Sequence, residues 1–189
     1  QAAVGNGSAS ATLIVANYGN TYSQHIYTAQ ELSAAGVAAG PIQSVAFDYS
    51  GASSNYDKTQ TIYIGTTTQT EYTGAESTDF IPNLQIVNGP TLREYVPGWV
   101  TYTFNQPFIW DGSSNIVVGV LTNGDGTHMG SSGWSTNGTN VTANRTIYRY
   151  KDAAIIDVTN LSAVNNGSAS SIRPNAKFGQ QFTLEACPA

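Results

Sequence analysis

Charged residues are scarce in this chain of 189 residues. Lysine and arginine number seven, aspartate and glutamate twelve, and together they make up 10% of the sequence, with a formal net charge of −5. A protein that binds nucleic acid or an anionic membrane surface needs clustered basic side chains, so the composition argues against both partners. The surface must then consist largely of Ser, Thr, Asn, Gln and Gly, which suits exposed β-structure more than helices.

Cysteine and long apolar runs are also missing. Cys187 is the only cysteine, so no internal disulfide can form, and packing, hydrogen bonds or a metal must hold the fold. No segment approaches the roughly 20 apolar residues that span a bilayer, and residues 1–10 lack the basic end and apolar stretch of a signal peptide. We expect a mature or excised piece of a larger protein, with one module over residues 1–183 and a linker or the start of a following module over residues 184–189.

The common catalytic motifs are absent as well. His25 and His128 are the only histidines, and neither has a second ligand at zinc spacing. There is no Gly-x-Ser-x-Gly turn, and no base lies near Cys187 in the sequence. A glycosidase needs two carboxyl groups, one on each side of the sugar bond that it cleaves. The carboxylates in the irregular middle third of the chain show no such pairing pattern: Glu71, Glu76, Asp79 and Glu94. We therefore predict a protein without catalytic activity, and a hydrolase is the weakest alternative.

The clearest pattern in the chain is the segment Gly98–Val120. Val100, Tyr102 and Phe104 fall on one face of an alternating stretch, which is the period of a half-buried strand. Asp111–Asn115 is rich in turn formers, and the β-branched run that follows predicts a deeply buried second strand. We interpret the whole segment as a β-hairpin-like unit.

Similar alternation along the rest of the chain predicts an all-β protein. Further strands are expected at 11–17, 42–50, 59–66, 145–151, 172–178 and 180–184. The strands at 42–50 and 59–66 are expected to pair, and residues 80–87 to form edge strands. Thr28 and Glu31 form a capping box for one short helix over residues 29–35, which Gly36 should close. We predict a two-sheet antiparallel β-sandwich, jelly-roll-like, with a closed barrel as the alternative.

Two glycine-rich turns offer oxygen ligands for a structural calcium ion. Asp111 and Asn115 belong to one turn and Asp125 to the other, and hard oxygen ligands on such loops are what calcium requires. Asp-Gly and Asn-Gly are also ordinary turn formers, and neither turn follows the twelve-residue EF-hand pattern. A plain turn is thus the alternative at both places.

Aromatic residues give the strongest indication of function. Sugar rings stack their apolar faces on Trp and Tyr, and this chain has 3 Trp and 11 Tyr. Trp134 stands in a loop of glycine, serine and threonine, so we expect it to be exposed. Tyr148 and Tyr150, beside Arg149, are candidates for a binding platform with it, although an aromatic stripe on alternate strand positions is more often part of a core. Two other tryptophans, Trp99 and Trp110, are assigned to packing.

Several of these segments together resemble a known kind of module. The resemblance is carried by SQHIYTAQELSAAG, IQSVAFDY, TIYIGTTT, GWVTYTFNQPFIWDGSSNIVVGV, RTIYRYKD and SIRPNAKFG, and it spans Ser23 to Gly179. The chain is similar to a β-sandwich module of secreted and cell-surface proteins of Bacteroidetes, which include multidomain peptidases, glycan-degrading enzymes and adhesins. The resemblance implies an accessory, non-catalytic role in adhesion or glycan binding.

The sequence therefore favours a non-catalytic carbohydrate-binding module of an exported bacterial protein. Its ligand-binding residues would be Trp134, Tyr148, Tyr150 and Arg149. The expected partners are a polysaccharide or glycan and the neighbouring domains of the same polypeptide, with no nucleic acid and no membrane insertion. We expect a monomeric module at the cell surface or outside the cell. The alternative is a structural or adhesive spacer that binds a protein partner.

Overall fold

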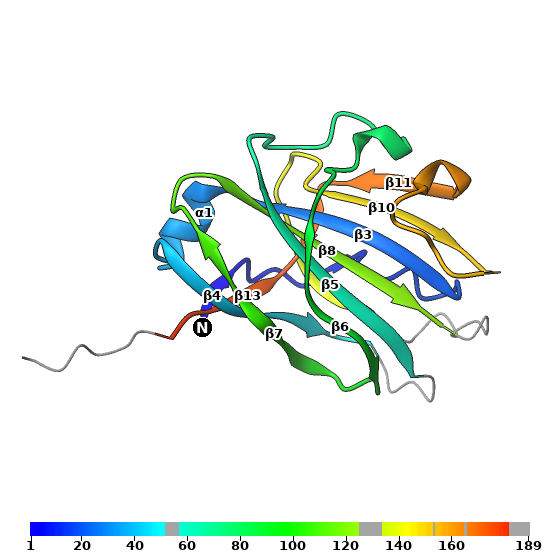
Figure 1. The fold of residues 1–189 in the computed structure, drawn as a ribbon, viewed down its shortest axis with the longest axis horizontal. Coiled ribbons are helices and arrows are strands. Elements are labelled where there is room, and N and C mark those ends of the chain that lie inside the picture. The colour runs from blue at the N-terminus through cyan, green and yellow to red at the C-terminus, as the bar shows by residue number, and fades with distance from the viewer. Residues whose placement is uncertain (52–56, 125–133, 153, 165, 182–189) are drawn as a thin grey trace, which may run out of the picture.

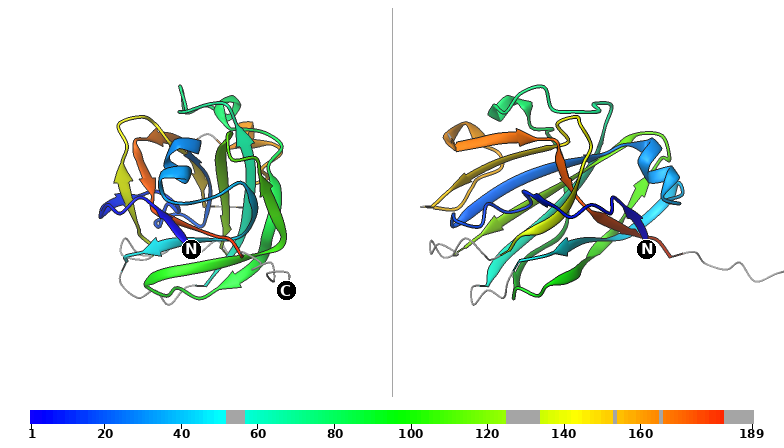
Figure 2. Two further views of the ribbon diagram at one scale, coloured as in Figure 1. Left: turned by 90° about the vertical axis from the view of Figure 1, so that its left-hand side faces the viewer. Right: turned by 180° about the vertical axis from the view of Figure 1, so that it is seen from behind.

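Two antiparallel sheets pack face to face in the computed structural model, which confirms the predicted all-β sandwich (Figure 1). The structure describes residues 1–51, 57–124, 134–152, 154–164 and 166–181. Figure 2 shows the two layers from the end and from behind. In the part of the chain so described, no helix has the length and apolar character needed to cross a membrane.

The two sheets divide the strands of the described residues between them. Sheet A contains seven strands: β1 (Ala2–Val4), β2 (Ala9–Ala11), β4 (Gly40–Tyr49), β7 (Gly98–Trp110), β9 (Thr136–Asn140), β12 (Ile172–Pro174) and β13 (Ala176–Gly179). Sheet B contains six, in the spatial order β11 (Asn166–Ser170), β10 (Thr146–Lys151), β3 (Asn20–Tyr27), β8 (Asn115–Asn123), β5 (Lys58–Thr67) and β6 (Gln85–Arg93). The helical segments are α1 (Ala29–Ala34), η1 (Ser77–Asp79) and η2 (Leu161–Ala163).

Sheet B is covered on both faces. One face packs on sheet A and forms the main core, to which β8 contributes Val118 and Val120. The other face carries a second apolar cluster, to which the same strand contributes Val117 and Leu121. Loops that contain η1 and η2 cover this second cluster with Phe80, Ile81, Ile156 and Leu161, among others. As a result all eight residues of β3, in the middle of the sheet, are buried.

The segment Gly98–Val120 forms both predicted strands, but it is not a hairpin. Strand β7 pairs with β4 in sheet A, whereas β8 pairs with β3 and β5 in sheet B. The turn at Asp111–Asn115 therefore crosses from one sheet to the other. Alternation within β7 is as predicted, with Tyr102 and Phe104 buried in the core. Trp110 is also buried, as expected for packing.

Two other predictions of local structure were wrong, and one was confirmed. Strands β4 and β5 form where expected but lie in different sheets, so they do not pair. Residues 12–17 are not a strand; they cross the open side of the sandwich, where the backbone of Leu13 accepts a hydrogen bond from Ser23. Helix α1 begins at its capping box as predicted, with Thr28 and Glu31 bonded reciprocally. Residues 182–189, which include the predicted linker, lie outside the described residues.

An ion cluster, buried at Arg173 and partly exposed at Glu31 and Arg145, ties the helix to both sheets. Glu31 Oε2 lies 2.8 Å from Nη1 of Arg145 and 2.8 Å from Nη1 of Arg173. Arg173 is almost fully buried on β12; it also donates to the backbone oxygen of Ile26 on β3 and lies over the ring of Tyr27 at 4.5 Å. Hydrogen bonds from Thr28 and the charge and hydrogen bond of Arg173 outweigh the burial of the Glu31 carboxyl and lower its pKa to about 2.

We predict that Arg173→Ala lowers the free energy of unfolding by about 3 kcal/mol or more, because it leaves the half-buried carboxylate of Glu31 with one cation fewer and opens a hole under Tyr27. Arg145→Ala is the matched control. Arg145 is more exposed than Arg173, so its removal should lower the free energy of unfolding clearly less. Urea unfolding followed by fluorescence measures both. Equal losses for the two variants would contradict a special role for Arg173.

Candidate functional site

Trp134 is buried, so the prediction that its ring is exposed was wrong. Its exposed fraction is 1%, and its ring packs edge-on against Tyr49 at 5.5 Å and Tyr95 at 5.2 Å between centroids. These two tyrosines come from β4 and from the segment between β6 and β7. The polar residues around Trp134 in the sequence gave no sign of partners so far away in the chain. The tryptophan therefore closes one end of the core.

Arg149 is also buried, and it does not join the two tyrosines beside it. Its side chain points to the outer face of sheet B, donates to the backbone oxygens of Val164 and Ala75, and lies 3.4 Å from Glu76 Oε2. These contacts connect the two loops that cover the outer face. The guanidinium is therefore occupied by the fold and is not presented to a ligand.

Tyr148 and Tyr150 do lie together, on the opposite face of β10 from Arg149. Their rings are stacked at 6.2 Å between centroids, and Tyr18 joins them with its ring 4.2 Å from that of Tyr150. All three rings are half-buried, so part of each meets solvent. We call these three residues the tyrosine row. The sequence singled out two of its members; Tyr18 was missed because it is distant in the chain and belongs to an irregular segment.

A groove of about 240 Å³ begins at one end of the tyrosine row. Tyr148 lines it together with Ser135 and most of the segment 10–17. Residues with hydroxyl groups, Ser10, Thr12 and Ser135, alternate with apolar residues in this lining. The arrangement places aromatic rings next to neutral hydrogen-bonding groups.

Two of the residues predicted to bind calcium, Asp111 and Asn115, lie in the described part of the chain, and the side chains of both make hydrogen bonds within the protein. Both oxygens of Asp111 accept hydrogen bonds from Ser113 and Ser114, and these bonds, the one from the Ser114 hydroxyl first, lower its pKa to about 2. Asn115 bonds the backbone of Ala29 and Gln69. Asp125 lies outside the described residues. Within the described ranges no three His, Cys, Asp or Glu side chains form a group that could hold a metal ion, and calcium stays a prediction.

Trp99, assigned above to packing, is the most exposed tryptophan among the described residues. Its exposed fraction is 39%, and the ammonium group of Lys177 lies 4.1 Å from the centre of its ring. A strand residue on the face opposite Tyr102 must point away from the core. The prediction failed because the alternation alone did not show that this face of β7 is uncovered.

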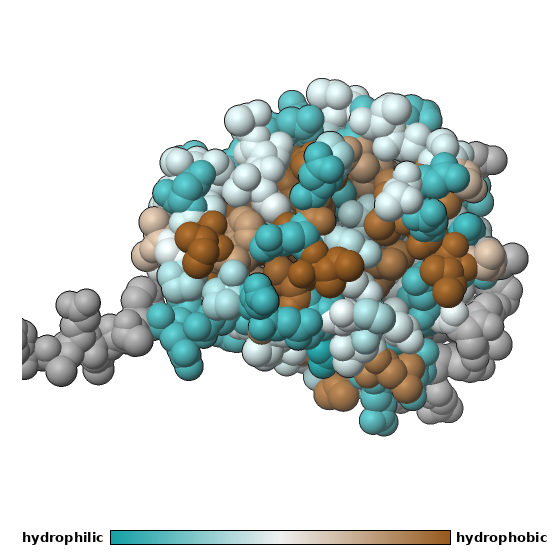
Figure 3. Space-filling view, in the orientation of Figure 1, coloured by the Kyte–Doolittle hydropathy of each residue, from teal (hydrophilic) through white to brown (hydrophobic). Residues whose placement is uncertain are grey.

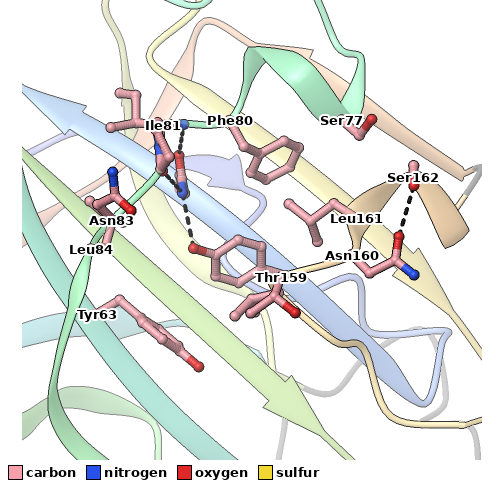
Figure 4. Close-up of a pocket in the computed structure, with 14 residues that line it drawn as sticks. Tyr63, Ser77, Phe80, Ile81, Asn83, Leu84, Thr159, Asn160, Leu161 and Ser162 are labelled. Atoms are coloured by element: carbon pink, nitrogen blue, oxygen red, sulfur yellow. Dashed lines mark hydrogen bonds between the residues drawn. The ribbon is translucent and has the colours of Figure 1, made fainter.

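A larger hollow lies on the outer face of sheet B, at a place the sequence did not indicate (Figure 4). It measures about 550 Å³, and the tyrosines Tyr22 and Tyr63 lie in its floor. Its walls are Ser77, residues 80–84 and residues 158–162, which belong to the two loops that cover the second cluster. Burial, and to a lesser extent the charge of Asp157, raises the pKa of Tyr63, so its phenol is neutral and can donate a hydrogen bond. The sequence predicted the strands from their periodicity. The loops that form these walls have no periodicity, so the sequence did not indicate the hollow.

Ser23, His25 and Thr146 form a chain of hydrogen bonds that superficially suggests nucleophilic catalysis. His25 Nε2 lies 3.0 Å from Ser23 Oγ, and Nδ1 lies 3.0 Å from Thr146 Oγ1. The Ser23 hydroxyl, however, donates its proton to the backbone oxygen of Leu13, so Nε2 must donate to Ser23 and cannot act as its base. All three side chains are buried between the sheets. The chain of bonds therefore satisfies polar groups in the core.

Comparison of the chain with models of protein families, with curated proteins and with solved structures found no match.

We predict that stability falls between pH 6.5 and pH 4.5 because of His25. Burial, and then the positive charge of Arg173, lowers the pKa of this imidazole from 6.5 to about 3, so below pH 6.5 the unfolded chain binds a proton that the folded one does not. The unfolding free energy should drop by about 1.4 kcal/mol per pH unit below pH 6. The loss tied to Glu31, with a pKa of about 2, begins only near pH 4.5.

The measurement is urea unfolding at pH 7.0, 6.0, 5.5 and 5.0 in a His128→Gln background, which leaves His25 as the only histidine. Adding His25→Asn should flatten the dependence in this window. A slope that is the same with and without His25 would refute the assignment.

Proposed function

We propose that this chain is a non-catalytic carbohydrate-binding module of an exported bacterial protein, and that it stacks sugar rings on the tyrosine row. The observation that carries the proposal is the arrangement of Tyr18, Tyr148 and Tyr150, three partly exposed rings in contact with one another at the end of a polar groove. The resemblance of the sequence to accessory modules of Bacteroidetes surface proteins supports the same function.

Tyrosine suits a sugar ligand on physical grounds. The ring offers an apolar face to the C–H groups of a pyranose, and the phenol can exchange hydrogen bonds with a sugar hydroxyl. Serine and threonine hydroxyls line the adjacent groove, where they can bond further hydroxyls of the chain. The rings are held by one another and by β10, so little side-chain entropy is lost on binding.

The composition of the molecule favours a neutral ligand. Only seven lysines and arginines occur in the sequence, and two of them, Arg145 and Arg173, are engaged with Glu31. Arg149, which lies between Tyr148 and Tyr150 in the sequence, is buried on the other face of β10, and Lys151, next to Tyr150, is half-buried. A glycan with carboxylate or sulfate groups would find little positive charge to compensate its desolvation.

We predict that Tyr150→Ala weakens polysaccharide binding about tenfold, since Tyr150 is the middle ring and contacts both others. Affinity electrophoresis through gels containing neutral plant and bacterial polysaccharides measures the effect. Trp99→Ala is the control, because it removes an exposed aromatic from the other sheet and should change nothing. If Trp99→Ala abolishes retention in the gel and Tyr150→Ala does not, the tyrosine row is refuted as the binding site.

A second candidate function, a spacer that docks on a neighbouring domain, is supported by a different observation. Four large aliphatic side chains on or between β6 and β7 are exposed: Ile86, Leu92, Val96 and Ile109. Hydrophobic side chains are visible on the face where these two strands lie (Figure 3). A module that no polysaccharide retards, and whose self-association or domain docking is lost in Leu92→Ser, would favour the spacer over the glycan binder.

A further inference from the structure

The floor of the hollow on the outer face of sheet B is packed closely around a glycine. Gly119 on β8 lies directly between Gln24 on β3 and Tyr63 on β5. A Cβ atom at this position would lie 3.1 Å from the hydroxyl of Tyr22 and from Cβ of Tyr63, and 3.2 Å from Leu84. A side chain at this position would displace its neighbours, so Tyr22, Tyr63 and Leu84 close over Gly119 and line the hollow themselves.

The wall above this floor is fixed by one buried amide. The side chain of Gln24 accepts a hydrogen bond from the backbone N–H of Ile81 and donates one to its backbone oxygen, both at 2.9 Å. The hydroxyl of Tyr72 donates to the same amide oxygen, and the amide nitrogen also donates to the hydroxyl of Tyr22. These hydrogen bonds hold the loop against the sheet, as backbone hydrogen bonds hold a neighbouring strand. The hollow is therefore formed before any ligand binds.

No charged side chain lines the hollow. Its 14 lining residues are two tyrosines, one phenylalanine, aliphatic residues and neutral polar residues. Figure 4 shows Asn83 and Leu84 on one side and Asn160 and Ser162 on the other. Within the described chain, the side-chain amide of Asn83 and the amide nitrogen of Asn160 donate no hydrogen bond. Neutral hydrogen-bonding groups therefore face each other across an apolar and aromatic floor.

We propose that this hollow, called the outer pocket, binds the terminal residue of a neutral sugar chain. The proposal rests on the proposed function for the ligand class and adds a second site to it. A pyranose ring has apolar faces and a rim of hydroxyls, which match the aromatic rings of Tyr63 and Phe80 and the amides of Asn83 and Asn160. Walls on both sides leave room for the end of a chain, whereas the tyrosine row can take residues along it.

Other ligand classes fit the outer pocket less well. A phosphate or a carboxylate would enter a site without a cation in its lining, at the full cost of desolvation. A purely apolar ligand would bury the amides of Asn83 and Asn160 without partners, at a cost of about 1–3 kcal/mol for each group. A neutral polyhydroxylated ring avoids both penalties.

The two sites are on opposite faces of sheet B. Tyr148 of the tyrosine row pairs directly with Ser23, which points into the sandwich, whereas the next residue, Gln24, points outward into the outer pocket. Directly paired residues share a face of the sheet. One sugar residue therefore cannot touch both sites, and each can be tested alone.

The experiment is an amide NMR titration of the whole chain with methyl glycosides of glucose, galactose, mannose and N-acetylglucosamine, and with glucuronic acid as the charged comparison. We expect at least one neutral glycoside to shift the amide signals of Leu84, Asn160 and Leu161, which line the outer pocket, in a saturable way, and glucuronic acid to shift none of them. Asn160→Ala and Asn83→Ala should each weaken this binding about fivefold, because that is the change in affinity expected from the loss of one typical hydrogen bond.

Asn166→Ala is the matched control, because Asn166 is an exposed asparagine on β11 that does not line the outer pocket. The proposal is overturned if no neutral glycoside shifts these signals, if glucuronic acid shifts them equally, or if the rim variants bind like Asn166→Ala. Shifts confined to Tyr148 and Tyr150 would refute the outer pocket and leave the tyrosine row intact. If the outer-pocket signals shift but Tyr150→Ala does not change retention by polysaccharide gels, the tyrosine row is refuted instead.

Discussion

Strand β3 has no side in contact with water, and much of the structure depends on that constraint. A strand in the middle of a sheet that is covered on both faces must pair every polar group it carries. On the inner face Ser23 and His25 bond each other, Leu13 and Thr146; on the outer face Gln24 bonds the backbone of Ile81. These pairings decide which irregular segments can lie against the sheet: one crosses the open side of the sandwich and the other forms the wall of the outer pocket.

The two candidate sites follow from this arrangement and differ for the same reason. On the inner face, near the edge of sheet B, β10 is only partly covered, so Tyr148 and Tyr150 keep some exposed ring surface. On the outer face the loops cover the second cluster, and a hollow remains between residues 80–84 and 158–162. One site is thus an incompletely covered edge, and the other is an opening within a covered face.

Much of the fold could be predicted from the sequence, but the site only in part. Period-two alternation identified β4, β5, β7 and β10, and the capping box identified α1, because these signals are local. Whether β7 and β8 pair or cross between sheets depends on partner strands far away in the chain, β4 for β7 and β3 and β5 for β8, which a local pattern does not encode. The prediction that Trp134 is exposed failed for the same reason. Its neighbours in the sequence are polar, while Tyr49 and Tyr95 are its neighbours only in space.

The pairing of β1 with β13 has a mechanical consequence. Ala2 lies opposite Phe178 and Val4 opposite Ala176, so the first and last described residues lie at the same end of one antiparallel ladder. A force that separates residue 1 from residue 181 would load this ladder in the unzipping direction, in which hydrogen bonds break one after another instead of all at once. Under tension β1 should peel away first, while β13 is still held by β4 and sheet B with its outer pocket is not yet under load.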